Sequence, residues 1–298
     1  MAGRVGVLGL GLMGEAFAQH FISDGYEVLG FDPEAKCRDA VAEAGGEVFD
    51  TIAEVVNGVE LVILSLPNSD IMLEVSSDIV ASGADGLLVI DTTTGNPDHS
   101  LTAAEQLAGA GHSYVDATIS GNAAQFRERD VIYMVGGEPD DVERTIALLT
   151  PLGRGVYPVG GISSGSRAKL VVNHILSINR TAVAEGLAVA EKAGIDLDSM
   201  LTILRDSAAY SKAMDLWGDR MVSGEYHPPA SRIRQSHKDS RLINDHAESI
   251  GASHDVVDMV RQHFVEAEEG GLSDSDNAAM IEVMRRRAGI GRIDPPMA

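Results

Sequence analysis

Three glycines near the start of the chain have the spacing of a phosphate-binding turn. Gly9, Gly11 and Gly14 form G-x-G-x-x-G between the apolar run 4–8 and the helix-forming residues 15–21. In this context the glycines make a tight turn, let a pyrophosphate approach the backbone, and allow close helix–strand packing beneath a phosphate-facing helix N-terminus. The residues predicted to hold a dinucleotide here are Gly9, Leu10, Gly11, Leu12, Met13 and Gly14. The alternative is a tight turn in an unrelated α/β domain.

A second predicted strand, 26–31, ends in Asp32. A carboxylate at this position can accept hydrogen bonds from the ribose hydroxyls of the adenosine and would repel a 2′-phosphate. The expected cofactor is therefore NAD. Lys36 and Arg38 follow closely, so NADP stays open as an alternative.

Lys169 and Asn173 are four residues apart in a predicted helix, which puts them on one face. A partly buried lysine beside a cofactor can donate or accept a proton, because desolvation favours its neutral form. From the spacing alone, the competing interpretation is a solvated lysine on an amphipathic helix.

Strands alternate with helices up to about residue 160. The predicted strands are 4–8, 27–31, 61–66, 87–91, 114–117, 131–135 and 156–159. Nearly continuous apolar strands of this kind predict a mainly parallel, doubly wound sheet, with ligands at the carboxyl ends of its strands. A long buried helix, 166–193, and further helices follow. We expect an α/β dinucleotide-binding domain at 1–162 and an all-α domain at 163–298 for substrate binding and oligomerisation.

The composition excludes several functional classes. The chain has 298 residues and a formal charge of −22, which argues against binding to nucleic acid or to an anionic membrane. The single cysteine, Cys37, allows no internal disulfide and is typical of a reducing cytoplasm, where we expect the protein. We recognise no secretory signal and no histidine or cysteine cluster with metal-ligand spacing.

Tyr210 and Trp217 are expected to pack in the helical core rather than line a substrate pocket.

Four motifs in order resemble those of the β-hydroxyacid dehydrogenases, a family that includes 3-hydroxyisobutyrate dehydrogenase and tartronate semialdehyde reductase. They are the glycine turn 9–14, the substrate motif 116–122, the catalytic motif G-x-x-x-K-x-x-x-N at 165–173, and Lys238-Asp239. The resemblance covers essentially the whole chain. It implies a Rossmann domain, a long interdomain helix, an all-α C-terminal domain and a homodimer or homotetramer.

The resemblance also implies a reaction and a set of roles. Hydride would pass between the carbinol carbon of a short 3-hydroxy acid, the expected small-molecule partner, and the nicotinamide. Lys169 would be the general acid–base, and Asn173 would orient it or the substrate oxygen. The substrate carboxylate would bind to Ser120, Gly121 and Asn122. Lys238 would lie at the nicotinamide end, and the cofactor walls would be Leu66, Pro67, Thr93 and Thr94, although Thr94 is equally suited to capping a strand end.

The motifs depart from the family pattern at several positions. Thr118 replaces a proline and Asn122 replaces a glycine. Asn122 can bind the substrate or shape the loop, and Arg232 can bind an anionic or polyhydroxylated substrate or pair with the acidic surface. These departures leave the acid unidentified among compounds such as 3-hydroxyisobutyrate, glycerate and threonate.

Two other functions remain in competition. Imine reductases share this architecture, but Lys169 argues against that activity because those enzymes typically carry another residue there. A non-catalytic dinucleotide-binding module is the alternative from another class, and the Lys169–Asn173 pair argues against it.

Overall fold

The structure is a computed structural model that describes residues 3–290 and divides into two compact units, 1–169 and 170–298. The division falls at Lys169, inside a helix, whereas the domain boundary predicted from the sequence is at 162. That predicted boundary stays a prediction, and the end of the predicted helical domain, 291–298, lies outside the described residues.

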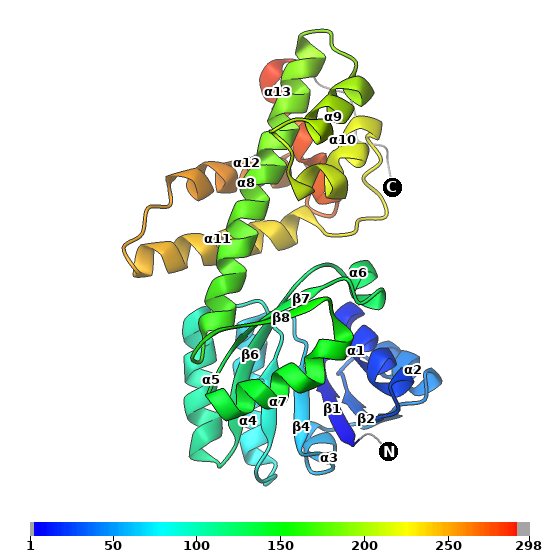
Figure 1. Ribbon diagram of the computed structural model, residues 1–298, viewed down its shortest axis with the longest axis vertical. Helices are drawn as coiled ribbons and strands as arrows, with labels where there is room; N and C mark the ends of the chain where they lie inside the picture. The colour runs from blue at the N-terminus through cyan, green and yellow to red at the C-terminus, as the bar shows by residue number, and fades with distance from the viewer. Residues whose placement is uncertain (1–2, 291–298) are drawn as a thin grey trace. The chain divides into compact units, whose positions relative to one another are not determined.

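The first unit is built on a sheet in the order β3-β2-β1-β4-β5-β6-β7-β8 (Figure 1). The strands are β1 (Arg4–Leu8), β2 (Glu27–Phe31), β3 (Glu47–Val48), β4 (Leu61–Leu64), β5 (Leu88–Asp91), β6 (Ser113–Ser120), β7 (Ile132–Gly136) and β8 (Gly155–Gly160). All neighbouring strands are parallel except β6 and β7, which are antiparallel. The predicted mainly parallel Rossmann sheet is thus confirmed.

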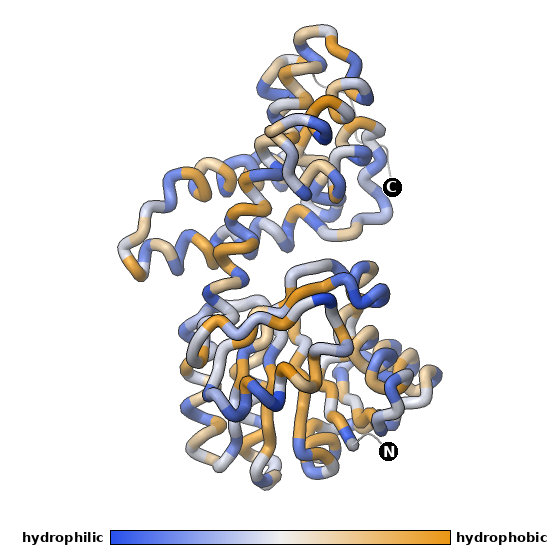
Figure 2. The backbone as a smooth tube through the Cα atoms, viewed as in Figure 1, coloured by the Kyte–Doolittle hydropathy of each residue, from blue (hydrophilic) through white to orange (hydrophobic). Residues whose placement is uncertain are grey.

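Helices cover both faces of this sheet. They are α1 (Leu12–Ser23), α2 (Ala35–Glu43), α3 (Ile52–Val56), α4 (Ser69–Ala81), α5 (Pro97–Gly109), α6 (Ala123–Arg127) and α7 (Pro139–Leu149). On β5, Leu88 and Ile90 join the core beneath α1, α2 and α7, while Val89, with Leu87 just before the strand, joins the core beneath α3, α4 and α5. Figure 2 shows these strands as largely hydrophobic segments. Because β1, β4 and β5 are buried on both faces, their sequences are nearly continuous apolar runs.

Three short elements of the first unit were not predicted from the sequence. The two-residue strand β3 and the five-residue helices α3 and α6 are too short to produce a periodic pattern of apolar residues. Only pairing with β2 identifies β3 as part of the sheet.

The second unit is helical among its described residues. The long helix α8 (Ser164–Lys192) begins in the first unit and continues into the second. It is followed by α9 (Leu197–Asp206), a π-helical turn (Met214–Gly218), α10 (Asp219–Ser223), α11 (Ile233–Ser249), α12 (Asp255–Glu269), a 3-10 turn (Asn277–Ala279) and α13 (Met280–Ala288). The expected long helix and all-α domain are confirmed.

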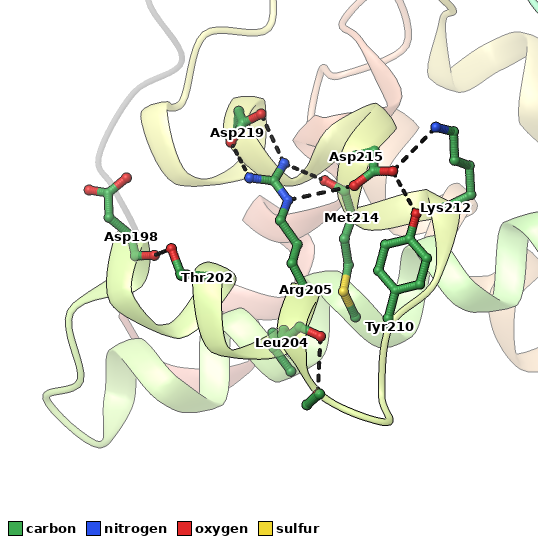
Figure 3. A network of polar contacts seen from close by, with 10 residues as sticks. Asp198, Thr202, Leu204, Arg205, Tyr210, Lys212, Met214, Asp215 and Asp219 are labelled. Carbon is green, nitrogen blue, oxygen red and sulfur yellow. Dashed lines mark hydrogen bonds and ion pairs between the residues drawn. The ribbon is translucent and has the colours of Figure 1, made fainter.

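A polar network joins α9 to the π-helical turn (Figure 3). Arg205 donates to both carboxylate oxygens of Asp219, at 3.0 and 2.9 Å, and to the carbonyl oxygen of Met214 at 3.0 Å. Tyr210 donates to Asp215 at 2.7 Å and is half exposed. The expectation that Tyr210 packs in the core is therefore wrong, because its hydroxyl pairs with a carboxylate at the surface, whereas Trp217 is buried as expected.

Candidate functional site

The glycine turn between β1 and α1 has a separate physical reason for each glycine. Gly9 has φ +87°, and a Cβ there would lie 2.3 Å from the carbonyl oxygen of Ser65. A Cβ on Gly14 would lie 1.8 Å from the carbonyl oxygen of Gly9, so α1 could not pack so closely on the turn. A Cβ on Gly11 would meet nothing within 4 Å, so the backbone is open to a ligand at that residue. The residues present fit a pyrophosphate above the first turn of α1.

Asp32 lies directly beside this turn. Its carboxylate accepts hydrogen bonds from the backbone N–H of Leu10 at 2.7 Å and of Glu34 at 2.8 Å, and the residue is buried. Arg38 is already engaged, because it donates to the carbonyl oxygen of Asp32 at 2.6 Å and pairs with Asp50 at 3.3 Å. The charge nearest the turn is therefore negative, which favours ribose hydroxyls over a 2′-phosphate.

The ends of β4 and β5 are tied together by side chains. The hydroxyl of Thr93 accepts a hydrogen bond from the N–H of Leu66 at 3.3 Å, and the N–H of Thr93 donates to Asp91 at 2.9 Å. Pro67 is exposed and Thr94 is partly buried. These residues line the edge at which the glycine turn also lies, and their contact with a cofactor stays a prediction.

Asp91, the last residue of β5, is a buried carboxylate. It accepts from the hydroxyl of Tyr114 at 2.8 Å. Burial raises the pKa of Asp91 to about 6, against the opposing effect of hydrogen bonds from Thr93 and Tyr114. In the folded state the carboxyl therefore holds its proton to a higher pH than in the unfolded chain.

This difference predicts a pH dependence of stability. Between about pH 4 and pH 6 the folded state binds more protons at Asp91 than the unfolded state, so stability falls as the pH rises through this window. Relative to Asp91→Asn, the free energy of unfolding of the wild type should fall by on the order of 2–3 kcal/mol between these two pH values. Above about pH 7 the difference between the two proteins should not change further. Urea unfolding of both proteins at several pH values measures this fall. The prediction is wrong if the free energy of unfolding changes with pH by the same amount in both proteins.

The loop after β6 holds the predicted carboxylate-binding residues. Ser120 ends β6, and Gly121 has φ +147°. The side chain of Asn122 accepts from the N–H of Gln125 at 2.9 Å, and its own N–H donates to the Gln125 side chain at 3.1 Å. Asn122 thus caps α6, which agrees with the interpretation that it shapes the loop. Substrate contact by the three residues stays a prediction.

The helix that carries Lys169 is attached to β6. Asp116, four residues before Ser120 on this strand, accepts from the N–H of Ser163 at 2.8 Å and of Ser166 at 2.6 Å. Lys169 is partly buried in the second turn of α8. The strand that ends at the Ser120 loop is therefore also the strand that holds the start of the Lys169 helix.

The remaining candidates lie in the second unit. Asn173 donates to Asp239 on α11 at 3.1 Å, and Lys238 pairs with the same carboxyl group at 3.6 Å. Arg232 pairs with the exposed Asp274 at 3.6 Å, which agrees with the surface-pairing alternative. The roles of Asn173, Lys238 and Arg232 in the reaction stay predictions.

Sequence reasoning gave no role to Asp116 and Asp91, although both stand out in the structure as buried carboxyls. Burial raises the pKa of Asp116 to about 7, against the effect of its bonds to Ser166 and Ser163. The sequence signal that could have identified both residues is an acidic residue at or near the end of a predicted apolar strand, where burial is expected.

Two properties of residues 3–290 bear on metal binding and membrane association. In this part of the chain no group of three or more histidine, cysteine, aspartate and glutamate side chains could hold a metal ion. No helix within the described residues is long and apolar enough to cross a membrane.

Family models match both parts of the chain. Residues 4–161 match the NAD binding domain of 6-phosphogluconate dehydrogenase. Residues 163–284 match the NAD-binding domain of NADP-dependent 3-hydroxyisobutyrate dehydrogenase. Together the two models cover most of the chain.

Individual relatives match over nearly their full length. Glyoxylate/succinic semialdehyde reductase 1 of Arabidopsis thaliana is 28% identical over 95% of this chain and 98% of its own. The 2-hydroxy-3-oxopropionate reductase of Escherichia coli is 26% identical over 96% and 98%. The solved structure of Mycobacterium tuberculosis 3-hydroxyisobutyrate dehydrogenase with L-serine has a TM-score of 0.88 at 23% identity, covering 96% of this chain and all of that one. This last likeness shows the fold.

Proposed function

The chain belongs to the β-hydroxyacid dehydrogenase family, and from this premise we propose that it moves a hydride between NAD and a short 3-hydroxy acid, with Lys169 as the general acid–base. It is an NAD(P)-dependent oxidoreductase that acts on hydroxy acids. The observation that carries the proposal is the attachment of the Lys169 helix to β6 through Asp116. One strand thereby positions both the lysine and the Ser120 loop.

In this proposal each group of site residues has its own role in the reaction. When bound, the nicotinamide supplies the hydride acceptor or donor. In oxidation Lys169 takes the proton of the substrate hydroxyl, and in reduction it returns a proton to the carbonyl oxygen. Ser120, Gly121 and Asn122 hold the substrate carboxylate with hydroxyl, backbone and amide donors. Asn173, on the same helix as Lys169, orients the lysine or the substrate oxygen.

The preference for NAD rests on Asp32. Replacing Asp32 with asparagine removes a charge that would repel a 2′-phosphate, and it weakens the acceptor for the ribose hydroxyls. We expect wild-type kcat/KM to favour NAD, and Asp32→Asn to reduce the NAD/NADP ratio by about tenfold. Initial rates with both cofactors measure the ratio.

A matched control for this change is Asp39→Asn, at an exposed position on α2. It removes the same charge from the same part of the chain and should leave the ratio at its wild-type value. Equal use of NAD and NADP by the wild type would show that the proposed preference is wrong.

The reaction itself is tested with a panel of substrates. Oxidation would be measured with 3-hydroxyisobutyrate, glycerate, threonate, 3-hydroxypropionate, serine and sulfonate analogues. Reduction would be measured with glyoxylate, succinic semialdehyde and 2-hydroxy-3-oxopropionate, the compounds in the names of the relatives. Turnover of one acid or its carbonyl partner supports the proposal. Reduction of a cyclic imine alone, or NADH binding without any turnover, would overturn it.

We further propose that the protein forms a homodimer or homotetramer in the cytoplasm. Exposed aliphatic side chains on α8, among them Val171, Ile175 and Val189, support an interface between copies. Sedimentation of the purified protein would give the oligomer mass, and a monomer would contradict this part of the proposal.

A further inference from the structure

We propose that Asp116 and Thr118 are positioning residues that fix Lys169 through the first turn of α8. The proposal rests on the proposed role of Lys169 as the general acid–base. Both residues lie on β6 and are fully buried. Neither needs to touch a substrate or a cofactor to have this effect.

The two side chains hold α8 by opposite kinds of hydrogen bond. Each carboxylate oxygen of Asp116 accepts one backbone N–H, from Ser163 at 2.8 Å and from Ser166 at 2.6 Å. The hydroxyl of Thr118 donates to the carbonyl oxygen of Gly165 at 2.8 Å. Because the anchored groups are backbone atoms, these bonds determine the position of the helix itself rather than of one side chain.

Close packing leaves the start of α8 little room to move. A Cβ on Gly165 would lie 2.5 Å from the carbonyl oxygen of Met134 and 2.6 Å from that of Asp116. The glycine of the G-x-x-x-K motif is thus required where the helix lies directly on β6 and β7. Lys169 is only one turn further along, so a shift of the first turn moves its amine.

A second set of bonds connects the same turn to α5. Ser163, at φ +75°, donates through its hydroxyl to the carbonyl oxygen of Pro97 at 2.8 Å. The hydroxyls of Ser166 and Ser100 are 3.0 Å apart. The start of α8 is therefore held between β6 and α5, and α5 begins three residues after Thr94 of the predicted cofactor wall.

Thr118 makes a contact that proline cannot make. Proline is usual at this position of the family's substrate motif. It has no hydroxyl that could donate to the carbonyl oxygen of Gly165. The substitution therefore has a structural consequence in this chain. In this chain Thr118 is a buried hydrogen-bond donor, and its loss leaves the carbonyl oxygen of Gly165 without that bond.

The test compares Thr118→Val with Thr118→Ser. Valine keeps the shape and removes the hydroxyl, and we expect kcat to fall about tenfold, since small misplacements of catalytic groups cost up to about 10²-fold. KM for NAD should stay near the wild-type value, because the glycine turn and Asp32 are unchanged. Serine restores the donor and should restore most of kcat. Asp116→Asn, which keeps only one of two acceptors, should lower kcat further.

Thr145→Val is the matched control. Thr145 is also fully buried and donates through its hydroxyl to a helix carbonyl, that of Asp141 at 2.8 Å, but on α7. It should lose a similar amount of thermal stability to Thr118→Val while keeping wild-type kcat. If Thr118→Val also keeps wild-type kcat, or if serine fails to restore it, the positioning role is wrong. Lys169→Met separates the two proposals. Loss of activity in this variant supports the proposed function, whether or not the Thr118 variants change kcat.

Discussion

Replacing Lys169 with methionine is expected to lower kcat by about 10²- to 10⁴-fold, the usual contribution of a positioned general acid–base. Methionine keeps most of the length of the side chain and its packing while it removes the ionisable amine. KM for NAD should change little, because the residues that fit the pyrophosphate lie at the β1–α1 turn. Steady-state rates with the best substrate of the panel, together with a titration of NADH fluorescence, separate chemistry from binding.

The same helix offers a matched control for Lys169. Lys192 is an exposed lysine in the last turn of α8, and its amine donates to the carbonyl oxygen of Ala288 at 2.9 Å. Lys192→Met should leave kcat at the wild-type value. Wild-type kcat in Lys169→Met would remove the proposed mechanism and give weight to another proton donor or to a binding function.

The second large effect is expected on stability, at Arg285 in α13. Its guanidinium is fully buried and donates to Glu191 at 2.6 Å and to Glu282 at 2.7 Å. Glu282 also accepts from the hydroxyl of Tyr226 at 2.6 Å. Arg285→Met would leave two partly buried carboxylates facing an apolar side chain, and we expect the free energy of unfolding to fall by about 3–5 kcal/mol. Urea unfolding monitored by circular dichroism measures the loss.

Arg287 provides the comparison on the same helix. Its ion pair with Glu266 lies at the surface, with side-chain exposures of 50% and 39%. Exposed pairs contribute at most about 1 kcal/mol, so Arg287→Met should cost little. Equal losses in the two variants would show that burial adds nothing to the Arg285 pairs.

Local patterns in the sequence predicted the elements that are marked by a long apolar run or by a glycine motif. Apolar runs closed by Asp32 and Asp91 identified β2 and β5, and G-x-G-x-x-G identified the turn between β1 and α1. The short β3 was not predicted, and a strand was predicted at 131–135 but not the antiparallel direction of β7, because strand direction and partner depend on contacts far along the chain. Asn122 shows the same limit at the level of a side chain, since its cap on α6 exists only because Gln125 lies within reach.

The sequence by itself determined the alternation of strands and helices, the glycine turn and the four family motifs, because each depends on neighbouring residues or on fixed spacing. The tertiary structure alone decided what Asp116 and Thr118 contact. Their partners, Ser163 just before α8 and Gly165 and Ser166 in its first turn, lie 47 to 50 residues further along the chain. Pairings at that separation follow from how β6 and α8 pack, and packing depends on the whole core rather than on any local pattern.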